Sequence, residues 1–82
     1  MLDEIKRLAG LGRILVRHHA RVRMAERGAT FDDLQHALTT ATGATWQPDR
    51  QTWRVDGGVD LDDDELTVVV DVEADVIVVT LF

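Results

Sequence analysis

The sequence predicts a single α+β domain over residues 1–82, with two or three N-terminal helices packed on a four-stranded antiparallel sheet. Three observations predict this fold. Apolar residues recur at helical spacing in the first half of the chain. After Gly43 the pattern changes to β-rich runs separated by turn signals. The length of 82 residues allows one domain with a small core, and no cysteine is present to reinforce that core.

The first helix is expected at residues 2–9. Apolar side chains recur there at helical spacing, two acids stand in the first turn, and Gly10 or Gly12 ends the helix. Residues 13–17 have β-branched character but form too short a run to classify. They are expected to be either a strand or a lead-in to the next helix.

Two further helices are expected in tandem. One runs from the paired histidines at 18–19 to Gly28, which supplies a C-terminal stop. Thr30 then has the character of an N-cap, and Asp33 completes a variant capping box. The apolar spacing that follows predicts a helix over about residues 31–40.

Four strands are expected in the second half, at residues 45–47, 52–55, 66–72 and 76–82. The last two runs are nearly continuous in apolar residues, so they are expected to pair as an antiparallel hairpin at the centre of the sheet. The helices are expected to cover one face. The valine and isoleucine side chains left on the other face predict a homodimer.

The two halves of the chain carry opposite charge. The formal net charge of -6 argues against a generic nucleic-acid coat protein, whose binding surface would be basic. All three histidines and seven of the nine basic residues, however, lie before Gly43, and ten of the fifteen acids lie after residue 42. Five arginines fall between Arg13 and Arg27, against one acid, Glu26. Such an asymmetry can mark a site for a charged partner.

Neither a targeting signal nor a membrane span is visible in the sequence. Acids stand near the start, where a secretory signal needs an uninterrupted apolar run. No stretch approaches the roughly 18 apolar residues of a membrane span. The expectation is a cytoplasmic protein with no membrane partner.

His19, Arg23 and Arg27 are the candidate catalytic residues. Their i, i+4, i+8 spacing places them on a narrow face of one helix. Arginine binds phosphate bidentately, and histidine exchanges a proton near neutral pH. The same spacing is also compatible with a structural role, in which Arg23 and Arg27 form buried ion pairs with the acids of the second half.

Other candidate sites are weaker. The acidic run 60–65 lacks the glycine and the spacing of a calcium loop, so it is expected to be a solvated connection. Adjacent histidines on a helix point about 100° apart, which disfavours a zinc site made with His36. Trp46 and Trp53 either stack on bases or serve as core or dimer contacts. No metal and no cofactor is therefore expected.

The run H-A-x-x-R-M-x-x-R-G that begins at His19 resembles a family of small bacterial proteins known as domain of unknown function 4258. Its members have this helix, a second helix and a β-meander ending in paired apolar strands, here over residues 14–82. The family is similar to the RelE-like toxins, small ribonucleases of toxin–antitoxin systems. The resemblance implies RNA as substrate, metal-independent cleavage, a cognate antitoxin as partner, and catalytic roles for His19, Arg23 and Arg27.

This chain departs from the RelE-like pattern in two ways. It is acidic, whereas those ribonucleases are usually basic. Many of them use a polar or aromatic hydroxyl residue near the C-terminus, where this chain has Phe82 and only Thr80 or Arg54 as substitutes.

A second function therefore stays open: a non-catalytic dimeric protein-interaction module whose Arg-rich helix is structural. The surroundings of Arg23 and Arg27 distinguish the two functions. An open cleft favours the enzyme, and buried ion pairs favour the module.

Overall fold

The computed structural model describes residues 1–82, and local sequence chemistry accounts for most of its helices and strands. The elements in chain order are α1 (Leu2–Gly10), β1 (Ile14–Val16), α2 (His18–Arg27), α3 (Phe31–Thr40), β2 (Gly43–Gln47), β3 (Thr52–Asp56), β4 (Val68–Val72) and β5 (Val76–Leu81).

The junction between α2 and α3 follows the chemistry that the sequence predicts. Gly28 ends α2 in the left-handed conformation, at φ 67°, where a Cβ would be strained. Thr30 then begins α3 with a complete capping box: its hydroxyl accepts from the Asp33 N–H, and the Asp33 carboxylate accepts from the Thr30 N–H. Both helix boundaries are thereby confirmed.

The sheet differs from the prediction in one strand. It has five strands in the order β1-β5-β4-β3-β2, and β1 pairs parallel to β5 while every other pair is antiparallel. The expected four-stranded antiparallel sheet is therefore wrong in detail, although the α+β class and the antiparallel β2–β5 meander are confirmed. Residues 14–16 form the extra strand because they pair with the outer edge of β5, where the Arg17 N–H donates to the Val78 carbonyl over 3.1 Å.

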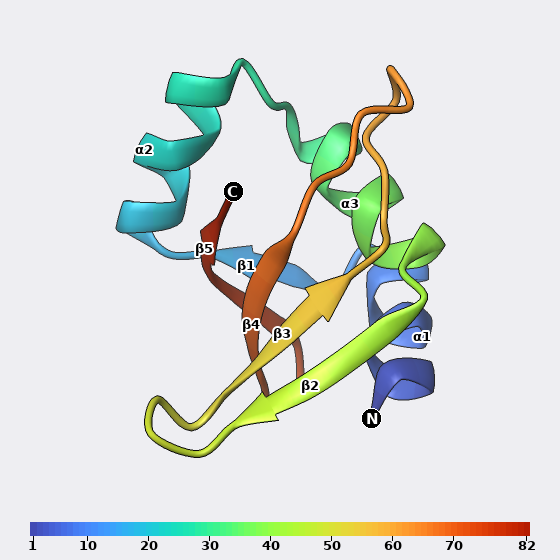
Figure 1. The fold of residues 1–82 in the computed structure, drawn as a ribbon, viewed down its shortest axis with the longest axis vertical. Coiled ribbons are helices and arrows are strands. Elements are labelled where there is room, and N and C mark those ends of the chain that lie inside the picture. Colours follow the sequence, from blue (N-terminus) through green and yellow to red (C-terminus); the bar gives the residue numbers. More distant parts are fainter.

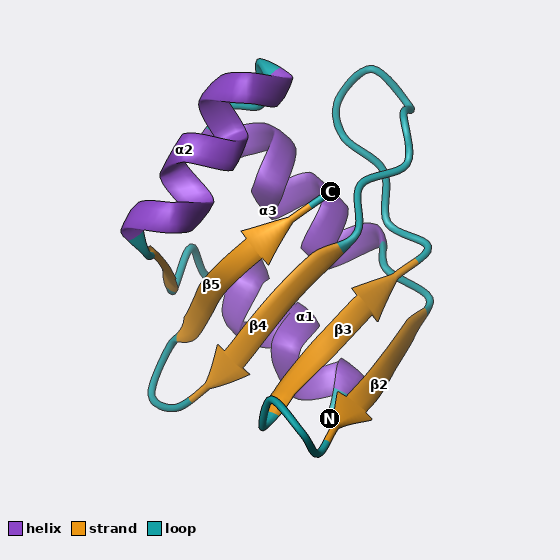
Figure 2. Ribbon diagram, turned by 60° about the vertical axis from the view of Figure 1, so that its left-hand side comes forward, coloured by secondary structure: helices purple, strands orange, loops and turns teal.

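The helices occupy two places around the sheet (Figure 1). Helices α1 and α3 pack against each other and lie on one face, behind the strands in Figure 2. Helix α2 packs against β5, near the C-terminus of the chain. The core between the helices and the sheet is a single apolar cluster, whose fully buried larger side chains are Ile5, Leu34, Leu38, Leu66, Leu81, Val55, Val68, Val70, Val76 and Val78.

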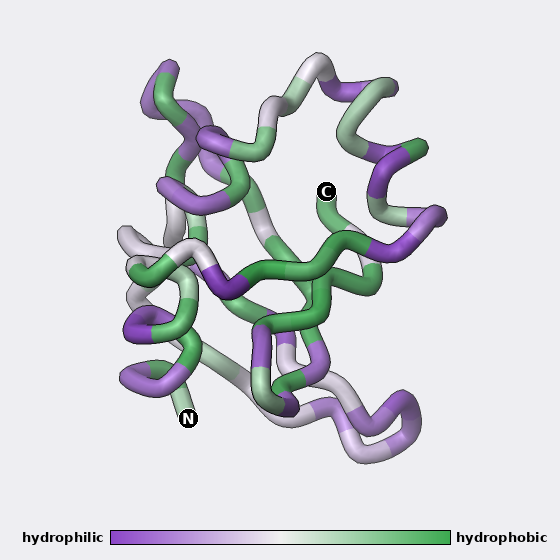
Figure 3. The backbone as a smooth tube through the Cα atoms, turned by 180° about the vertical axis from the view of Figure 1, so that it is seen from behind, coloured by the Kyte–Doolittle hydropathy of each residue, from purple (hydrophilic) through white to green (hydrophobic).

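No helix covers the other face of the sheet (Figure 2). The strand register places Arg54, Val69 and Thr80 in one row across that face. The same register places Leu15 beside Ile77 in another row. The backbone coloured by hydropathy shows that the central strands are the most apolar part of the chain, whereas the β2–β3 turn is hydrophilic (Figure 3).

The Asp33 carboxylate couples the stability of this fold to pH. Hydrogen bonds from the Thr30 N–H and then the Leu61 N–H hold the pKa of Asp33 below its ordinary value of 3.8. Because the folded pKa is the lower one, the stabilisation is present above the unfolded pKa and is lost as pH falls through the folded value.

We therefore expect Asp33→Asn to lower the free energy of unfolding at neutral pH and to flatten its decline below about pH 4. Urea unfolding at a series of pH values measures both effects. The matched control is Asp32→Asn, because Asp32 lies in the same helical turn and its side chain accepts no hydrogen bond. If the two variants have identical pH profiles, the assignment to Asp33 is wrong.

Candidate functional site

The candidate residues lie on α2. Two apolar side chains of this helix, one small and one flexible, pack it against the rest of the protein. Ala20 is fully buried in the core, and Met24, one turn later, packs partly against it. These two residues set the inward face of α2 against β5. The remaining side chains of α2 are exposed or half-buried.

Arg23 is half-buried and contacts the end of the last strand. Its Nε donates to the Leu81 carbonyl oxygen over 3.2 Å. Its Nη1 lies 3.5 Å from Glu26 Oε1 in the same helix, and 36% of its side chain is exposed. Arg23 thus connects α2 to β5 through a backbone carbonyl, while part of its guanidinium group remains in contact with solvent.

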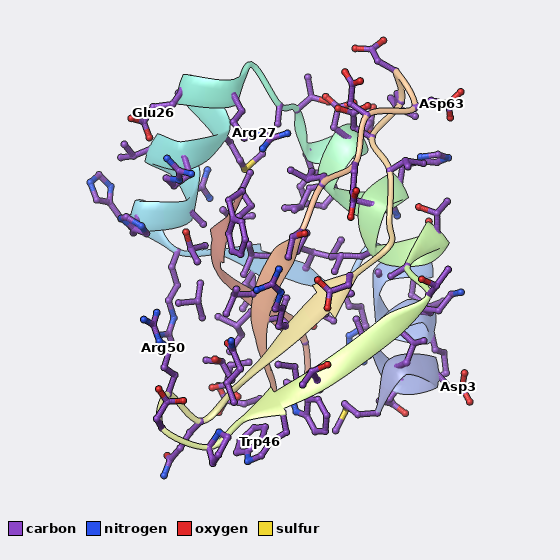
Figure 4. The ribbon with its side chains drawn as sticks, in the orientation of Figure 1. Asp3, Glu26, Arg27, Trp46, Arg50 and Asp63 are labelled. Atoms are coloured by element: carbon purple, nitrogen blue, oxygen red, sulfur yellow. The ribbon has the colours of Figure 1, made fainter.

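Arg27 is exposed and lies one turn farther along the same face. Its Nη2 donates to the Glu65 carbonyl oxygen over 3.4 Å, a long hydrogen bond. Figure 4 shows Arg27 pointing from α2 toward the segment that precedes β4, while Glu26 points away from it. Glu26, the sequence neighbour of Arg27, therefore lies on a different face of α2.

His19 is exposed, and neither ring nitrogen forms a hydrogen bond within the chain. Arg17, His18 and Arg21 are likewise exposed, and their side chains have no ion pair or hydrogen bond within the chain. The start of α2 is therefore a surface of free cationic and titratable groups.

No carboxylate of the second half pairs with α2. Asp75 binds Arg13 over 2.9 Å, and Asp56 binds Arg54 over 2.9 Å. In the acidic run, Asp60 accepts from the backbone N–H groups of Asp62 and Asp64. The carboxylate that pairs with α2 is Glu26, which belongs to the helix itself.

Neither arrangement that the sequence left open is present. Arg23 and Arg27 contact backbone carbonyls and form no buried ion pair with the second half. No cleft is lined by them either, because the cavity of the protein lies elsewhere. His19, Arg23 and Arg27 remain together on α2, as their spacing predicts, on an open surface.

The cavity lies where α3 meets the end of α1 and the acidic run. It has a volume of about 400 Å³. His36 lies in its wall, with Nδ1 hydrogen-bonded to the Val59 carbonyl over 2.9 Å. Its lining residues are Gly10, Asp32, Gln35, His36, Thr39 and Leu61. Sequence reasoning missed this cavity because its walls come from three segments that only tertiary packing brings together.

The remaining candidates take structural positions. The rings of Trp46 and Trp53 lie across the β2–β3 pair, with centroids 5.2 Å apart and planes inclined by 56°. The Arg54 guanidinium lies 5.1 Å from the centre of the Phe82 ring, a cation–π contact. No group of three or more histidines, cysteines or acids comes together as metal ligands.

Neither the scan against family models nor the searches of curated proteins and of solved structures found a match. None of the three helices has the length and apolar character needed to cross a membrane.

Proposed function

We propose that this chain is a small toxin-like protein of RelE-like architecture that binds RNA along α2 and cleaves it without a metal ion. The observation that carries the proposal is the free cationic surface at the start of α2. The order of α2, α3 and the β2–β5 meander also supports it, because that order matches the family that the His19 motif resembles.

The attraction between α2 and RNA would be electrostatic and local. A net charge of -6 repels a polyanion at long range, but that repulsion is screened beyond about 8–10 Å at physiological salt. Within that distance, a phosphate beside α2 meets Arg17 and Arg21, which no acid of the chain neutralises. Arg23 and Arg27 lie with His19 on another face of the helix, since Arg23 is about 160° around the axis from Arg21, so α2 carries cations on two sides.

The proposed chemistry uses His19 as a general base. Neutral imidazole accepts the proton of a ribose 2′-hydroxyl, and the 2′ oxygen attacks the adjacent phosphorus. The bond from phosphorus to the 5′ oxygen breaks, and that oxygen takes a proton from water, leaving a 2′,3′-cyclic phosphate. The guanidinium groups of Arg23 and Arg27 stabilise the charge that develops on the phosphoryl oxygens.

Purified protein incubated with single-stranded RNA tests this proposal. We expect His19→Ala to lower the cleavage rate about 100-fold or more, because general acid–base catalysis typically contributes about 10²–10⁴-fold. Arg23→Ala is expected to weaken both cleavage and binding. DNA of the same sequence, which lacks the 2′-hydroxyl, should bind but remain intact, and a metal chelator should leave the rate unchanged.

Arg50→Ala is the matched control, because Arg50 is exposed and extends from the β2–β3 turn, not from α2 (Figure 4). It should leave both cleavage and binding unchanged. Equal activity in the wild type, His19→Ala and Arg23→Ala would rule out the ribonuclease.

One observation favours the alternative, a non-catalytic interaction module. Arg23 and Arg27 bridge α2 to the carbonyls of Leu81 and Glu65, and no cavity lies beside them. On this alternative, α2 is held in place to dock an acidic protein partner, such as a cognate antitoxin. Arg23→Ala and Arg27→Ala would then lower the melting temperature, and no RNA cleavage would be observed in any variant.

A further inference from the structure

The two edges of the sheet differ in how they are protected. Strands β1 and β2 are the outermost strands of the sheet, and no further strand pairs with either. An edge strand exposes unpaired N–H and C=O groups, which can pair with a strand of another molecule. Short strands, flanking charges, prolines and bulges are the devices that prevent such pairing.

Strand β1 has two of these devices, and β2 has few of them. Strand β1 is three residues long and is flanked by Arg13 and Arg17. Strand β2 is five residues long, reads GATWQ, and contains no charge and no proline. Its register with β3 is regular, without a bulge to twist its edge away. The next residue, Pro48, limits pairing at one end of the strand only.

An aromatic side chain also lies exposed on this uncharged edge. Trp46 is 44% exposed although its ring lies against Trp53. Ala44, two residues earlier, is on the same face of the strand and is small. Figure 4 shows Trp46 on the outermost strand, away from α2.

We propose that β2 pairs antiparallel with β2 of a second copy of this chain, which joins two five-stranded sheets into one continuous sheet. The sequence of β2 favours a second copy as the partner. In the register that places Thr45 on the two-fold axis, Ala44 lies opposite Trp46 of the other copy, so a small side chain faces a large one. Because β2 carries no charge, this register places no like charges opposite each other.

The interface differs from the open face, where the sequence placed the dimer contact. A five-residue pairing buries less than the roughly 1,200 Å² of a stable interface, so the dimer should be weak and concentration-dependent. The association of the two copies should become stronger as the salt concentration rises. Two molecules of net charge -6 repel each other, so salt should strengthen a neutral, backbone-mediated contact. Binding of RNA to α2 would weaken with salt, so this proposal stands or falls independently of the ribonuclease.

Sedimentation equilibrium over a range of protein concentrations, at low and high salt, tests the proposal. Thr45→Lys and Thr45→Glu are the decisive variants, because each places like charges across the two-fold axis. Each alone should be monomeric at concentrations where the wild type dimerises. An equimolar mixture should restore dimers, since the opposite charges then face each other. Leu15→Lys, on the β1 edge, is the matched control and should dimerise like the wild type.

Three outcomes would overturn the proposal. A wild type that stays monomeric at every concentration means that no second copy binds, whether or not another protein uses this edge. Dimers that persist in both Thr45 variants place the contact elsewhere. If both Thr45 variants are monomeric and their mixture is also monomeric, repulsion between like charges at position 45 is not the reason that the variants fail to dimerise. Circular dichroism of each variant, which should match that of the wild type, verifies its fold.

Discussion

Gly58→Ala is expected to lower the free energy of unfolding by about 3 kcal/mol, the upper end of the usual cost of overpacking a core. Gly58 is buried where the chain passes α3, and an added Cβ would lie 1.8 Å from the Ala37 carbonyl oxygen. Both atoms in this collision are close to the backbone, so no flexible side chain can yield. Relief requires the 57–60 segment to move off α3, which breaks the hydrogen bond between the Leu66 N–H and the Gly58 carbonyl.

Thermal unfolding measures this effect, and a loss of that size corresponds to about 12–24 °C in melting temperature for a domain of this length. Gly10→Ala is the matched control, because its Cβ would meet nothing within 4 Å at the end of α1. That variant should melt at or slightly above the wild-type temperature. If Gly58→Ala and Gly10→Ala melt together, the close approach is not a determinant of stability.

Leu34→Ala is expected to cost about 2–5 kcal/mol, because truncating a buried leucine leaves a cavity as well as less apolar burial. Leu34 lies on α3 with no exposed surface and belongs to the single core cluster. Leu61→Ala is the control of the same chemistry, because 59% of Leu61 is exposed. Urea unfolding should show a lower midpoint for Leu34→Ala at a similar slope, and little change for Leu61→Ala.

The expected cost of Leu34→Ala is large compared with the total free energy of unfolding of a small domain. Domains of ordinary size are stable by about 5–15 kcal/mol, and short chains lie near the lower limit. Leu34→Ala is therefore expected to remove a large part of this protein's free energy of unfolding. A midpoint equal to that of Leu61→Ala would contradict the single-core description.

The parts of the fold that the sequence predicted depend on local chemistry. Gly28, Thr30 and Asp33 each act within a few residues of their own position, so the boundaries of α2 and α3 followed from them. Strand β1 did not follow, because three residues carry too little pattern and their partner lies at residues 76–78. The role of Gly58 was also invisible, since it depends on a contact with Ala37 across the fold.

The candidate site shows the same limit. The spacing of His19, Arg23 and Arg27 correctly placed them on one helix, because helical geometry is local. Their partners could not be predicted. Leu81 and Glu65 offer only backbone carbonyls to Arg23 and Arg27, and every residue has a carbonyl, so such a partner leaves no mark in the sequence.

The parallel pairing of β1 with β5 has a consequence for how the chain folds during its synthesis. Residues 14–16 leave the ribosome before residues 76–78, the strand segment that they pair with, have been made. Contacts so distant in sequence form slowly, because a long loop must close before they are gained. Until then Ile14 and Val16 remain exposed, so the nascent chain carries an unpaired apolar strand until β5 has been made. A chaperone that binds short apolar segments would find its target there, and completion of β5 would remove it.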